Sequence, residues 1–467
     1  MFSNFILSLQ HELWLFALIM LLLCIKLGSS EIKPAPLLLG INILLGLNFV
    51  SGFFFHHSGS LFSEMFISNE LKDFQKNILN LGVLLISLQS FVWLKSHQHI
   101  IEFYVLLLSS LMGMFFMISA GNILMLYIGL ELSTIPLAAA ANFNLDKRVS
   151  SEAAFKFIIS SALSSGVLLL GISFLYGATG TLQLTELSHL IHNTTFLVFT
   201  LILIIAGFGF KISAVPFHLW TADVYEGSPV AVTSFLSVIS KAAVIFVFTK
   251  TLLTAFDPLQ SVWPTIISLL ALLTIITGNV FAIRQQNIKR LLAFSSIAQV
   301  GFILIAISSN TVTGSIATVY FVLIYLFSNL AAFGVVSLIS AVTGKENIND
   351  YKELRKTNPM LCWVLTIALF SLAGVPPTAG FFGKFFLLMS GAPNNNFAVI
   401  VIAALNMMVS MYYYLRVVKI MFMDKNENPV EDIKIPWYSS FALIICVAGI
   451  VLTGILSGSY NYIFSIH

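Results

Sequence analysis

Five charged side chains lie inside long apolar stretches of the sequence, where a charged group is costly. They are Glu131, Lys156, Lys211, Lys241 and Lys384. A lysine at the centre of a membrane helix costs about 2.5–3.5 kcal/mol on the insertion scale. Membrane proteins keep such residues mainly where ions, protons or polar substrates move. The pattern therefore predicts a path for charge through a membrane.

Glu131 is the only acid that the sequence places at mid-depth, within GNILMLYIGLELSTIP. Burial disfavours the ionised form of a lone carboxylate, and a nearby lysine favours it. Lys211 and Lys241 are the candidate partners. A buried lysine can give up its proton, whereas an arginine stays charged. We therefore interpret these residues as proton-transfer groups, with a purely structural ion pair as the alternative.

Lys211, Lys241 and Lys384 lie deep in their stretches, so snorkelling of the ammonium group to the surface is the weaker interpretation. Lys156 differs because it lies only about a turn and a half after the start of its span. Ser160 extends its helix face, which favours a polar path. For Lys156, proton transfer and snorkelling stay equal alternatives.

Uncharged polar residues recur at similar depth. Pairs that share a helix face are Ser295 with Gln299, Tyr325 with Asn329, and Asn406 with Ser410. Hydrogen bonding between helices explains each pair at least as well as function does, but together they predict a file of water. His218 follows a proline, and an imidazole titrates near neutral pH. A proton-transfer role and an ordinary interfacial position fit His218 equally well.

The elements that hold these residues must be membrane helices. Of the 467 residues, 58% are hydrophobic and only 9% are charged, whereas soluble domains carry about 25% charged residues. Apolar runs of about 20 residues recur along the chain, as in transmembrane helices. The alternating segments of a β-barrel are not visible. The composition thus predicts an all-α polytopic membrane protein.

Motifs for cofactors are not visible. The three cysteines, Cys24, Cys362 and Cys446, lie far apart, which argues against a CxxC metal site or an iron–sulfur ligand set. Neither a Walker loop nor a GxGxxG segment after a strand occurs. We expect no metal and no cofactor in this chain, and the net charge of +3 gives no sign of nucleic-acid binding.

We predict about fourteen spans from the apolar runs. Their approximate bounds are 10–27, 35–55, 76–94, 99–118, 121–142, 151–176, 196–216, 229–249, 259–283, 288–308, 312–341, 359–391, 396–422 and 437–462. The first run has no basic start and no clear cleavage site, so we expect a retained span and not a signal peptide. Pro376 and Pro377 predict that span 359–391 is discontinuous.

Basic residues orient this arrangement. With the N-terminus outside, most loop lysines and arginines fall inside, and only Lys72, Lys76 and Lys250 fall in outside loops. Cytoplasmic loops carry an excess of lysine and arginine. We therefore predict an even number of spans with both termini on the outer side.

Two groups of five spans share a pattern of breaks. GFGFKISAVPFHLW contains Pro216 and SLAGVPPTAGFFGKFF contains Pro376 and Pro377, and each segment has glycines and one lysine. Inverted repeats with one broken helix each are typical of ion-coupled transporters, although glycine and proline are common in membrane helices anyway. The predicted organisation is a three-helix segment, 1–98, two inverted repeats, 99–250 and 251–422, and a C-terminal helix, 423–467.

Several long motifs carry a family resemblance. FKISAVPFHLWTADVYEGSPVAVTSFLSVISKAAV, RQQNIKRLLAFSSIAQVGFILIAI, SLAGVPPTAGFFGKFFLL and YYYLRVV occur in this order. The chain closely resembles subunit N of proton-pumping NADH–quinone oxidoreductase, respiratory complex I, called subunit 2 in mitochondria. The sister subunits L and M tend to read PFHTWLPDA, whereas PFHLWTADVYEGSP fits subunit N. The resemblance covers about Gly121 to Lys419.

The resemblance implies an antiporter-like, non-redox subunit of the membrane arm. In that family the residue at Glu131 pairs with the lysine at Lys211, and Lys241 and Lys384 continue a charged axis. Lys156 also matches a family position. Gln299 departs from members that carry a histidine there, and a glutamine cannot be protonated in this range. Water would then carry that step, or the histidine is not needed.

The resemblance also implies partners and a location. Other membrane-arm subunits, including neighbouring antiporter-like subunits, and the lipid bilayer are the expected partners. Flavin, iron–sulfur clusters and quinone are expected in partner subunits. The expected location is the bacterial inner membrane. Two alternatives stay open, namely a subunit of a multi-subunit cation/proton antiporter and a passive scaffold whose charges only lock helices together.

Overall fold

The computed structural model describes residues 2–28, 33–54, 58–391, 397–425, 429–456 and 458–467. The N-terminal elements are α1 (Phe2–Ser8), α2 (Gln10–Gly28), α3 (Pro34–Ser51), β1 (Gly59–Leu61), β2 (Phe66–Ser68), α4 (Glu70–Gln89) and α5 (Phe91–Lys95). The two short strands pair antiparallel.

The central elements are α6 (Ile100–Ser119), α7 (Ile123–Ala141), α8 (Arg148–Thr179), α9 (Leu184–Leu190), α10 (Thr195–Lys211), α11 (Leu219–Gly227), α12 (Val230–Ser234), the π-helix η1 (Phe235–Ser240) and α13 (Lys241–Thr254). They are followed by η2 (Asp257–Leu259), α14 (Trp263–Ile283), α15 (Ile288–Ser308), α16 (Val312–Thr343), η3 (Ile348–Tyr351) and α17 (Leu354–Thr357). The last elements are α18 (Pro359–Ala373), α19 (Ala379–Ser390), α20 (Phe397–Met423), α21 (Trp437–Ile455) and α22 (Gly458–Ile466).

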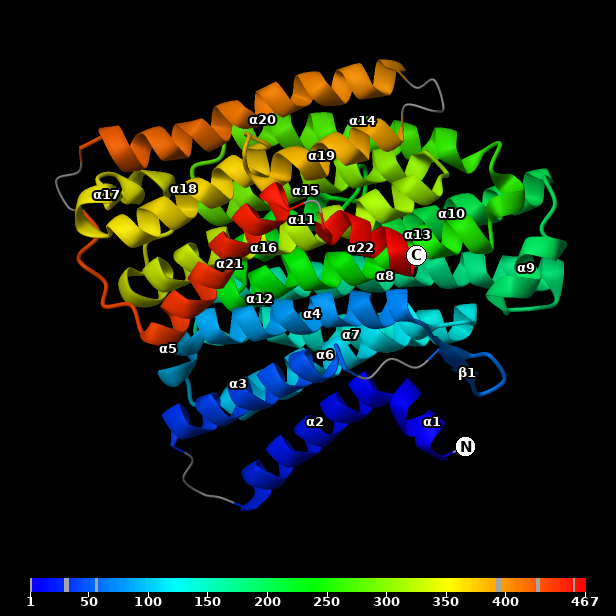
Figure 1. Ribbon diagram of the computed structural model, residues 1–467, viewed down its shortest axis with the longest axis horizontal. Coiled ribbons are helices and arrows are strands. Elements are labelled where there is room, and N and C mark those ends of the chain that lie inside the picture. Colours follow the sequence, from blue (N-terminus) through cyan, green and yellow to red (C-terminus); the bar gives the residue numbers. More distant parts are fainter. Residues whose placement is uncertain (1, 29–32, 55–57, 392–396, 426–428, 457) are drawn as a thin grey trace.

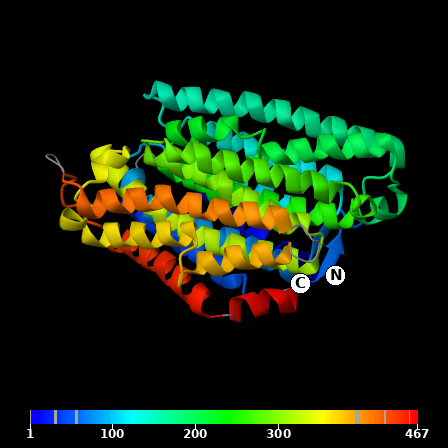
Figure 2. The same ribbon diagram turned by 90° about the horizontal axis from the view of Figure 1, so that it is seen from above.

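The long helices run side by side along the longest dimension of the molecule (Figure 1). In that view α2 and α3 lie along one long edge of the bundle and α20 lies along the opposite long edge, with α16 between them. Seen at right angles, α8 runs along one side, and α21 with α22 along the opposite side (Figure 2). Among the described residues, eleven helices are long and apolar enough to cross a membrane. The prediction of an all-helical, multi-pass membrane protein is therefore confirmed.

The core of the bundle lies around α15 and α16. The most apolar window of α15 is 100% buried and that of α16 is 94% buried, whereas the corresponding window of α20 is 22% buried. Large apolar side chains are exposed on the outer helices, for example Leu163 and Met408. Apolar exposure on outer helices is typical of lipid contact, so polar residues on α15 and α16 face the protein interior.

Both predicted helix interruptions are present. α10 ends at Lys211 and α11 begins at Leu219, with Pro216 between them. α18 ends at Ala373 and α19 begins at Ala379, with Pro376 and Pro377 between them. Proline removes a backbone donor and clashes with the preceding turn, which prevents the helix from continuing. The separate halves are too short to count among the eleven long helices.

The second interruption depends on two glycines. Gly374 has φ of 86°, a left-handed conformation that a glycine adopts without steric cost. A Cβ on Gly380 would lie 1.7 Å from the carbonyl oxygen of Ser371. The start of α19 therefore packs against the end of α18 more closely than any other residue type permits.

The third predicted span differs from the structure. α4 begins at Glu70 and not at residue 76, and Ser90 separates it from α5. Lys72 and Lys76 are therefore buried helix residues and not loop residues, and Lys250 lies within α13. The predicted span ends at residues 55 and 396 lie outside the described residues.

Candidate proton-transfer site

Lys211 is the last residue of α10, where the first interrupted helix stops. Its Nζ donates to Ser161 Oγ at 2.7 Å and to Thr134 Oγ1 at 3.2 Å. The carboxyl end of a helix carries a partial negative charge, which favours an ammonium group there. Neutral oxygens from α7 and α8 and the end of α10 thus stabilise the buried Lys211.

Glu131 lies on α7, one turn before Thr134, and within electrostatic range of Lys211. In the described part of the chain, no basic nitrogen lies within 4.0 Å of its carboxylate, and its buried Oε1 accepts no hydrogen bond. The two residues share a neighbourhood through Thr134 but form no direct ion pair. A functional Glu131–Lys211 pair stays a prediction.

Lys241 is the first residue of α13 and directly follows the π-helix η1. Single π-helical turns are frequent at functional sites. The side chain is 1% exposed, and its Nζ donates to Ser296 Oγ at 2.8 Å. The Nζ also lies 5.3 Å from the centre of the Tyr225 ring, within the range of a cation–π interaction.

Lys384 is fully buried on α19. Its Nζ donates to the carbonyl oxygens of Leu372 at 2.6 Å and Ala373 at 3.3 Å, and it lies 4.8 Å from the Phe302 ring centre. Leu372 and Ala373 end α18, so this ammonium group also meets the carboxyl end of a helix. Each interruption thus brings one lysine to the end of its first half-helix.

Polar side chains on α15 connect to the Lys384 group. Gln299 Nε2 donates to the Leu372 oxygen at 2.9 Å, which is the same oxygen that Lys384 contacts, and to the Tyr414 hydroxyl at 3.3 Å. The Tyr414 hydroxyl in turn lies 2.5 Å from Ser295 Oγ. Ser295 is next to Ser296, the hydrogen-bond partner of Lys241. α15 therefore contributes polar contacts to both lysine groups, with no hydrogen bond between Ser295 and Ser296 among the described residues.

A second polar group surrounds Lys241. Asn329 Nδ2 donates to Ser237 Oγ at 2.8 Å and to the Tyr325 hydroxyl at 2.5 Å. Ser237 Oγ lies 3.1 Å from the Tyr325 hydroxyl, and Tyr325 also reaches Ser296. The structure thus brings Tyr325 and Asn329 together with Lys241. Within the described residues, no hydrogen-bonded side chain links this group to Lys211.

Lys156 lies outside the buried row, and its place in a proton path stays a prediction. Its side chain is 40% exposed and forms ion pairs with Glu152 at 2.7 Å and Asp223 at 2.6 Å. Arg290 contacts Asp223 at 2.8 Å and Glu226 at 2.7 Å. Asp223 lies on α11, 67 positions from Lys156, so the local sequence around Lys156 gives no sign of this network.

His218 lies inside the first interruption, directly before α11. The residue is 9% exposed, and its Nδ1 is buried without a hydrogen-bond partner among the described residues. The position is compatible with a water-linked role, because an unpaired buried nitrogen is costly unless water reaches it. The role of His218 in proton transfer stays a prediction.

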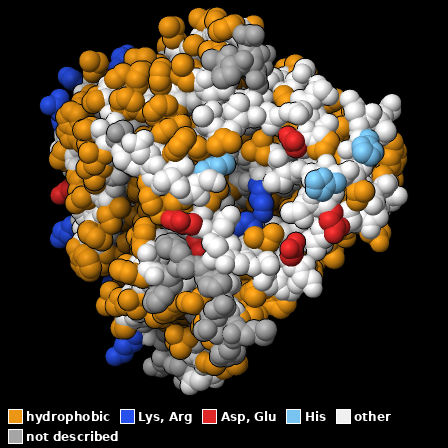
Figure 3. All heavy atoms as spheres, turned by 45° about the vertical axis from the view of Figure 1, so that its right-hand side comes forward, with side chains coloured by type: hydrophobic (Ala, Val, Ile, Leu, Met, Phe, Trp, Pro, Cys, Tyr) orange, Lys and Arg blue, Asp and Glu red, His pale blue; other side chains and the backbone are white. Residues whose placement is uncertain are grey.

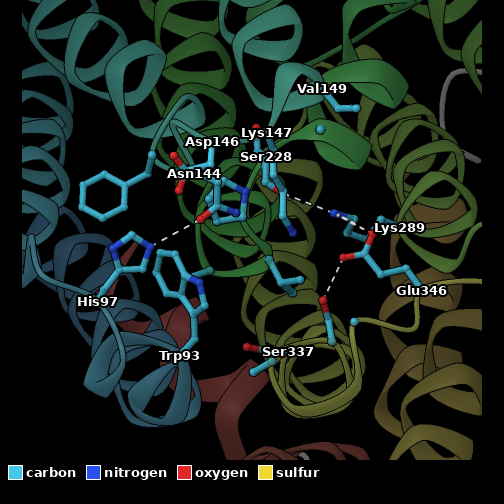
Figure 4. A pocket seen from close by; sticks show the side chains of 18 of the residues that line it. Trp93, His97, Asn144, Asp146, Lys147, Val149, Ser228, Lys289, Ser337 and Glu346 are labelled. Atoms are coloured by element: carbon cyan, nitrogen blue, oxygen red, sulfur yellow. Dashed lines mark hydrogen bonds and ion pairs between the residues drawn. The ribbon is translucent and has the colours of Figure 1, made fainter.

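A large vestibule opens between α5, α8, α12, α15 and α16 (Figure 4). Its volume is about 890 Å³. Lys289 contacts Glu346 at 3.0 Å and donates to the Ser228 oxygen at 3.3 Å, and His97 faces Asn144 at 3.4 Å on the other side. Asp146, Lys147 and Glu226 also line it. The vestibule places titratable groups beside the start of α12, the helix that leads to Lys241.

A buried ion pair in the N-terminal segment was not predicted. Glu12 on α2 contacts Lys76 on α4 at 2.7 Å, and the two side chains are 4% and 0% exposed. Lys76 also lies 5.0 Å from the Phe66 ring centre. Glu12 is buried near the start of α2, whereas Glu131 is partly buried within α7. The charged run ELKDFQKN resembles a loop because the partner of Lys76 lies more than sixty positions earlier in the sequence.

A helical membrane fold with two interrupted helices, each with a lysine at its break, defines the class of antiporter-like membrane subunits. A family profile described as NADH:quinone oxidoreductase/Mrp antiporter, transmembrane, matches residues 120–410. The chain belongs to this family, and within it to subunit N of NADH-quinone oxidoreductase, because a curated subunit N from Azobacteroides pseudotrichonymphae is 44% identical over 100% of this chain and 98% of its own length.

Solved structures support the same assignment. A chain of respiratory complex I from Thermus thermophilus is 27% identical, covers 96% of this chain and 97% of its own length, and superposes with a TM-score of 0.80. A chain of an Mrp complex from a Dietzia species superposes with a TM-score of 0.84 over 100% of both chains but is only 17% identical. The second likeness shows a shared fold alone.

Proposed function

We propose that this chain takes part in proton translocation as a membrane-arm subunit of NADH–quinone oxidoreductase, coupled to electron transfer from NADH to quinone. The observation that carries the proposal is the polar face of α15, which runs between two buried lysines. Lys241 contacts Ser296 there, and Lys384 shares the Leu372 oxygen with Gln299. A protein that only needed stability would fill such a core with apolar side chains.

Each lysine in this row is held by neutral oxygens. An ammonium group held by hydroxyl or carbonyl oxygens can lose its proton without leaving a carboxylate unpaired. In our proposal, Lys241 receives protons from the vestibule through water and the Tyr325–Asn329 group, and passes them along α15 to Lys384. Gln299 takes part as a hydrogen-bond donor and not as a proton carrier.

Glu131 and Lys211 are proposed to control the proton affinity of this row from one side. A change in their separation alters the field at the neighbouring lysine. Moving one charge against 100 mV requires about 2.3 kcal/mol, and ion pairs at an effective dielectric of about 20 change by similar amounts over a few ångströms. The gap between Lys211 and Lys241 would be bridged by water, with His218 as a further contact at the break.

The proposed arrangement in the membrane has about fourteen spans, with two inverted repeats at 99–250 and 251–422 and both termini outside in a bacterial inner membrane. Most lysines and arginines near the helix ends lie on the proposed inner side, and Lys72, Lys76 and Lys250 lie toward the proposed outer side. This excess of basic residues supports the orientation.

Redox chemistry is proposed to lie in partner subunits that hold flavin, iron–sulfur clusters and quinone, and neighbouring antiporter-like subunits are the proposed direct contacts. The decisive experiment is purification of the native complex through a tag on this chain. We expect flavin-containing and iron–sulfur subunits to co-purify, with NADH-driven proton movement in reconstituted vesicles. Recovery of the chain without them would contradict the proposal.

The cation/proton antiporter is the competing function, and the shared fold with the Mrp chain is its support. Vesicles that contain the chain but receive no NADH distinguish the two. Sodium-driven proton exchange under these conditions would favour the antiporter, whereas proton movement that needs NADH favours the oxidoreductase.

A further inference from the structure

Two lysines lie together at the end of the molecule opposite the vestibule. Lys72 on α4 is 4% exposed, and Lys250 on α13 is partly buried. Their amino groups donate to the main-chain oxygens of two adjacent residues, Ser119 and Ala120, and both side chains line one cavity. Two ammonium groups placed this close together repel each other. A negative group between or beside them would offset this repulsion.

The described residues do not supply that group. Lys72 Nζ donates to the oxygens of Ile67 at 2.8 Å and Ser119 at 3.4 Å, and Lys250 Nζ donates to the oxygen of Ala120 at 3.2 Å. No carboxylate of a described residue lies within 4.0 Å of either ammonium group. An ammonium group has three donors, so one donor on Lys72 and two on Lys250 are left after these contacts.

Two acids near the start of α4 have other partners. Glu12 pairs with Lys76 at 2.7 Å. Asp73 accepts a hydrogen bond from Ser68 at 2.9 Å and has further contacts. Neither carboxylate forms an ion pair with Lys72 or Lys250.

Both lysines line one cavity of about 190 Å³. A water molecule occupies about 30 Å³, so the cavity has room for a polyatomic ion. Gln75, which is 8% exposed, also lines it, and its amide makes no hydrogen bond to a described residue. Leu71 and Phe246 form part of the apolar wall. On this face of the molecule, basic side chains lie inside a hollow (Figure 3).

The geometry points to a binding site for a phosphate-bearing anion in this cavity, with Lys72, Lys250 and Gln75 as its polar contacts. Lysine binds phosphate oxygens as a point charge, and two lysines match the charge of a phosphate group. A chloride ion would leave most of the cavity empty, whereas a phosphate ester fits both the cationic end and the apolar wall. The phosphate belongs either to a lipid headgroup or to a free ion. This site is separate from the proposed proton path and does not depend on it.

The test uses the purified complex that contains this chain, after mild removal of lipid by detergent. One arm measures equilibrium binding of radiolabelled inorganic phosphate. The other arm measures retention of phosphatidylglycerol, with phosphatidylcholine for comparison, by quantitative mass spectrometry. We expect the double variant Lys72→Gln/Lys250→Gln to bind the relevant ligand about tenfold more weakly, and the variant Lys434→Gln, which neutralises an exposed lysine, to bind normally.

The two arms identify the source. Saturable phosphate binding that is lost in the double variant identifies a free ion as the ligand. Loss of phosphatidylglycerol alone from the double variant identifies a lipid headgroup as the ligand. The charge-conserving double variant Lys72→Arg/Lys250→Arg should retain binding. This variant separates an effect of lost charge from an effect of lost folding. Should the double variant not assemble, the single change Lys250→Gln at the more accessible lysine replaces it. Equal binding of both ligands by the wild-type complex and the neutralised variants would overturn the proposal.

Discussion

The buried lysines fall into two kinds according to what holds them. Among the described residues, the hydrogen-bond acceptors of Lys241 and Lys384 are hydroxyl or carbonyl oxygens, whereas Lys76 contacts the carboxylate of Glu12. A carboxylate partner favours the charged form of lysine and would be left unpaired when the proton leaves. The neutral partners of the first kind allow protons to come and go, and the ion pair of the second kind fixes its charge.

The role of Lys241 can be separated from its place in the packing. We expect Lys241→Met to lower NADH-driven proton pumping by about tenfold or more, because no group remains there to accept a proton. Lys241→Arg should be equally defective, because arginine keeps its charge but does not release its proton. The measurement is proton uptake into vesicles with NADH oxidation recorded in parallel. Normal pumping by the arginine variant would show that only a positive charge is needed.

The Glu12–Lys76 ion pair stabilises the N-terminal segment in our interpretation. We expect Glu12→Gln to destabilise the N-terminal segment by about 3–5 kcal/mol, because it leaves a buried ammonium group without a counter-charge. The double variant Glu12→Gln/Lys76→Met removes both charges and should be closer to the wild-type protein. Thermal unfolding of the purified complex measures the difference. A double variant no more stable than the single one would refute this account.

At the scale of elements, each of the two interruptions ends a helix where an ammonium group needs acceptors. α10 ends at Lys211 itself, and α18 ends at the oxygens that receive Lys384. The sites of both breaks were predictable, because proline and glycine act locally on the backbone. The partners of the lysines were not, because Ser161 and Ser296 come from other helices.

Gly380 gives a test of the second interruption. Gly380→Ala would place a Cβ against the Ser371 oxygen and push α19 away from α18. We expect a loss of about 1–3 kcal/mol in stability, together with weaker pumping because Lys384 moves from Leu372. The matched control is Gly166→Ala on α8, where nothing lies within 4 Å of the new atom. There alanine should be neutral or stabilising, and equal damage in both variants would contradict the explanation.

The limits of sequence reasoning follow the same distinction between local and distant causes. Apolar runs locate the membrane helices and the deep positions of Lys241 and Lys384 with no knowledge of packing. The predicted start of α4 is wrong because Lys76 pairs with Glu12 on α2, a distant partner that no local pattern shows. The sequence leaves the burial of Lys156 undecided for a similar reason, since Asp223 is 67 positions away.

At the scale of the whole molecule, two openings lie at opposite ends of the bundle. The vestibule lies beside the start of α12, and the Lys72–Lys250 cavity lies beside the end of α13. The almost fully buried α15 and α16 separate them. The proton path proposed above follows the polar contacts of α15, whereas the outer helices present apolar side chains.

The proposed orientation can be tested at these two ends. In a Cys24→Ser background, Val149→Cys places an exposed thiol at the vestibule and Thr254→Cys places one at the opposite end. We expect a membrane-impermeant thiol reagent to label Val149→Cys only in inside-out vesicles and Thr254→Cys only in right-side-out vesicles. The reverse pattern would invert the orientation, and labelling from both sides would show leaky vesicles or a wrong assignment of the two ends.

The shared acceptor for Lys384 and Gln299 is a main-chain oxygen, that of Leu372. Replacing the Leu372 side chain cannot delete this atom, so mutation can reach the contact only by redirecting the backbone. The hydrogen bonds themselves therefore do not constrain the identity of residue 372, but they do constrain the path of the main chain around it.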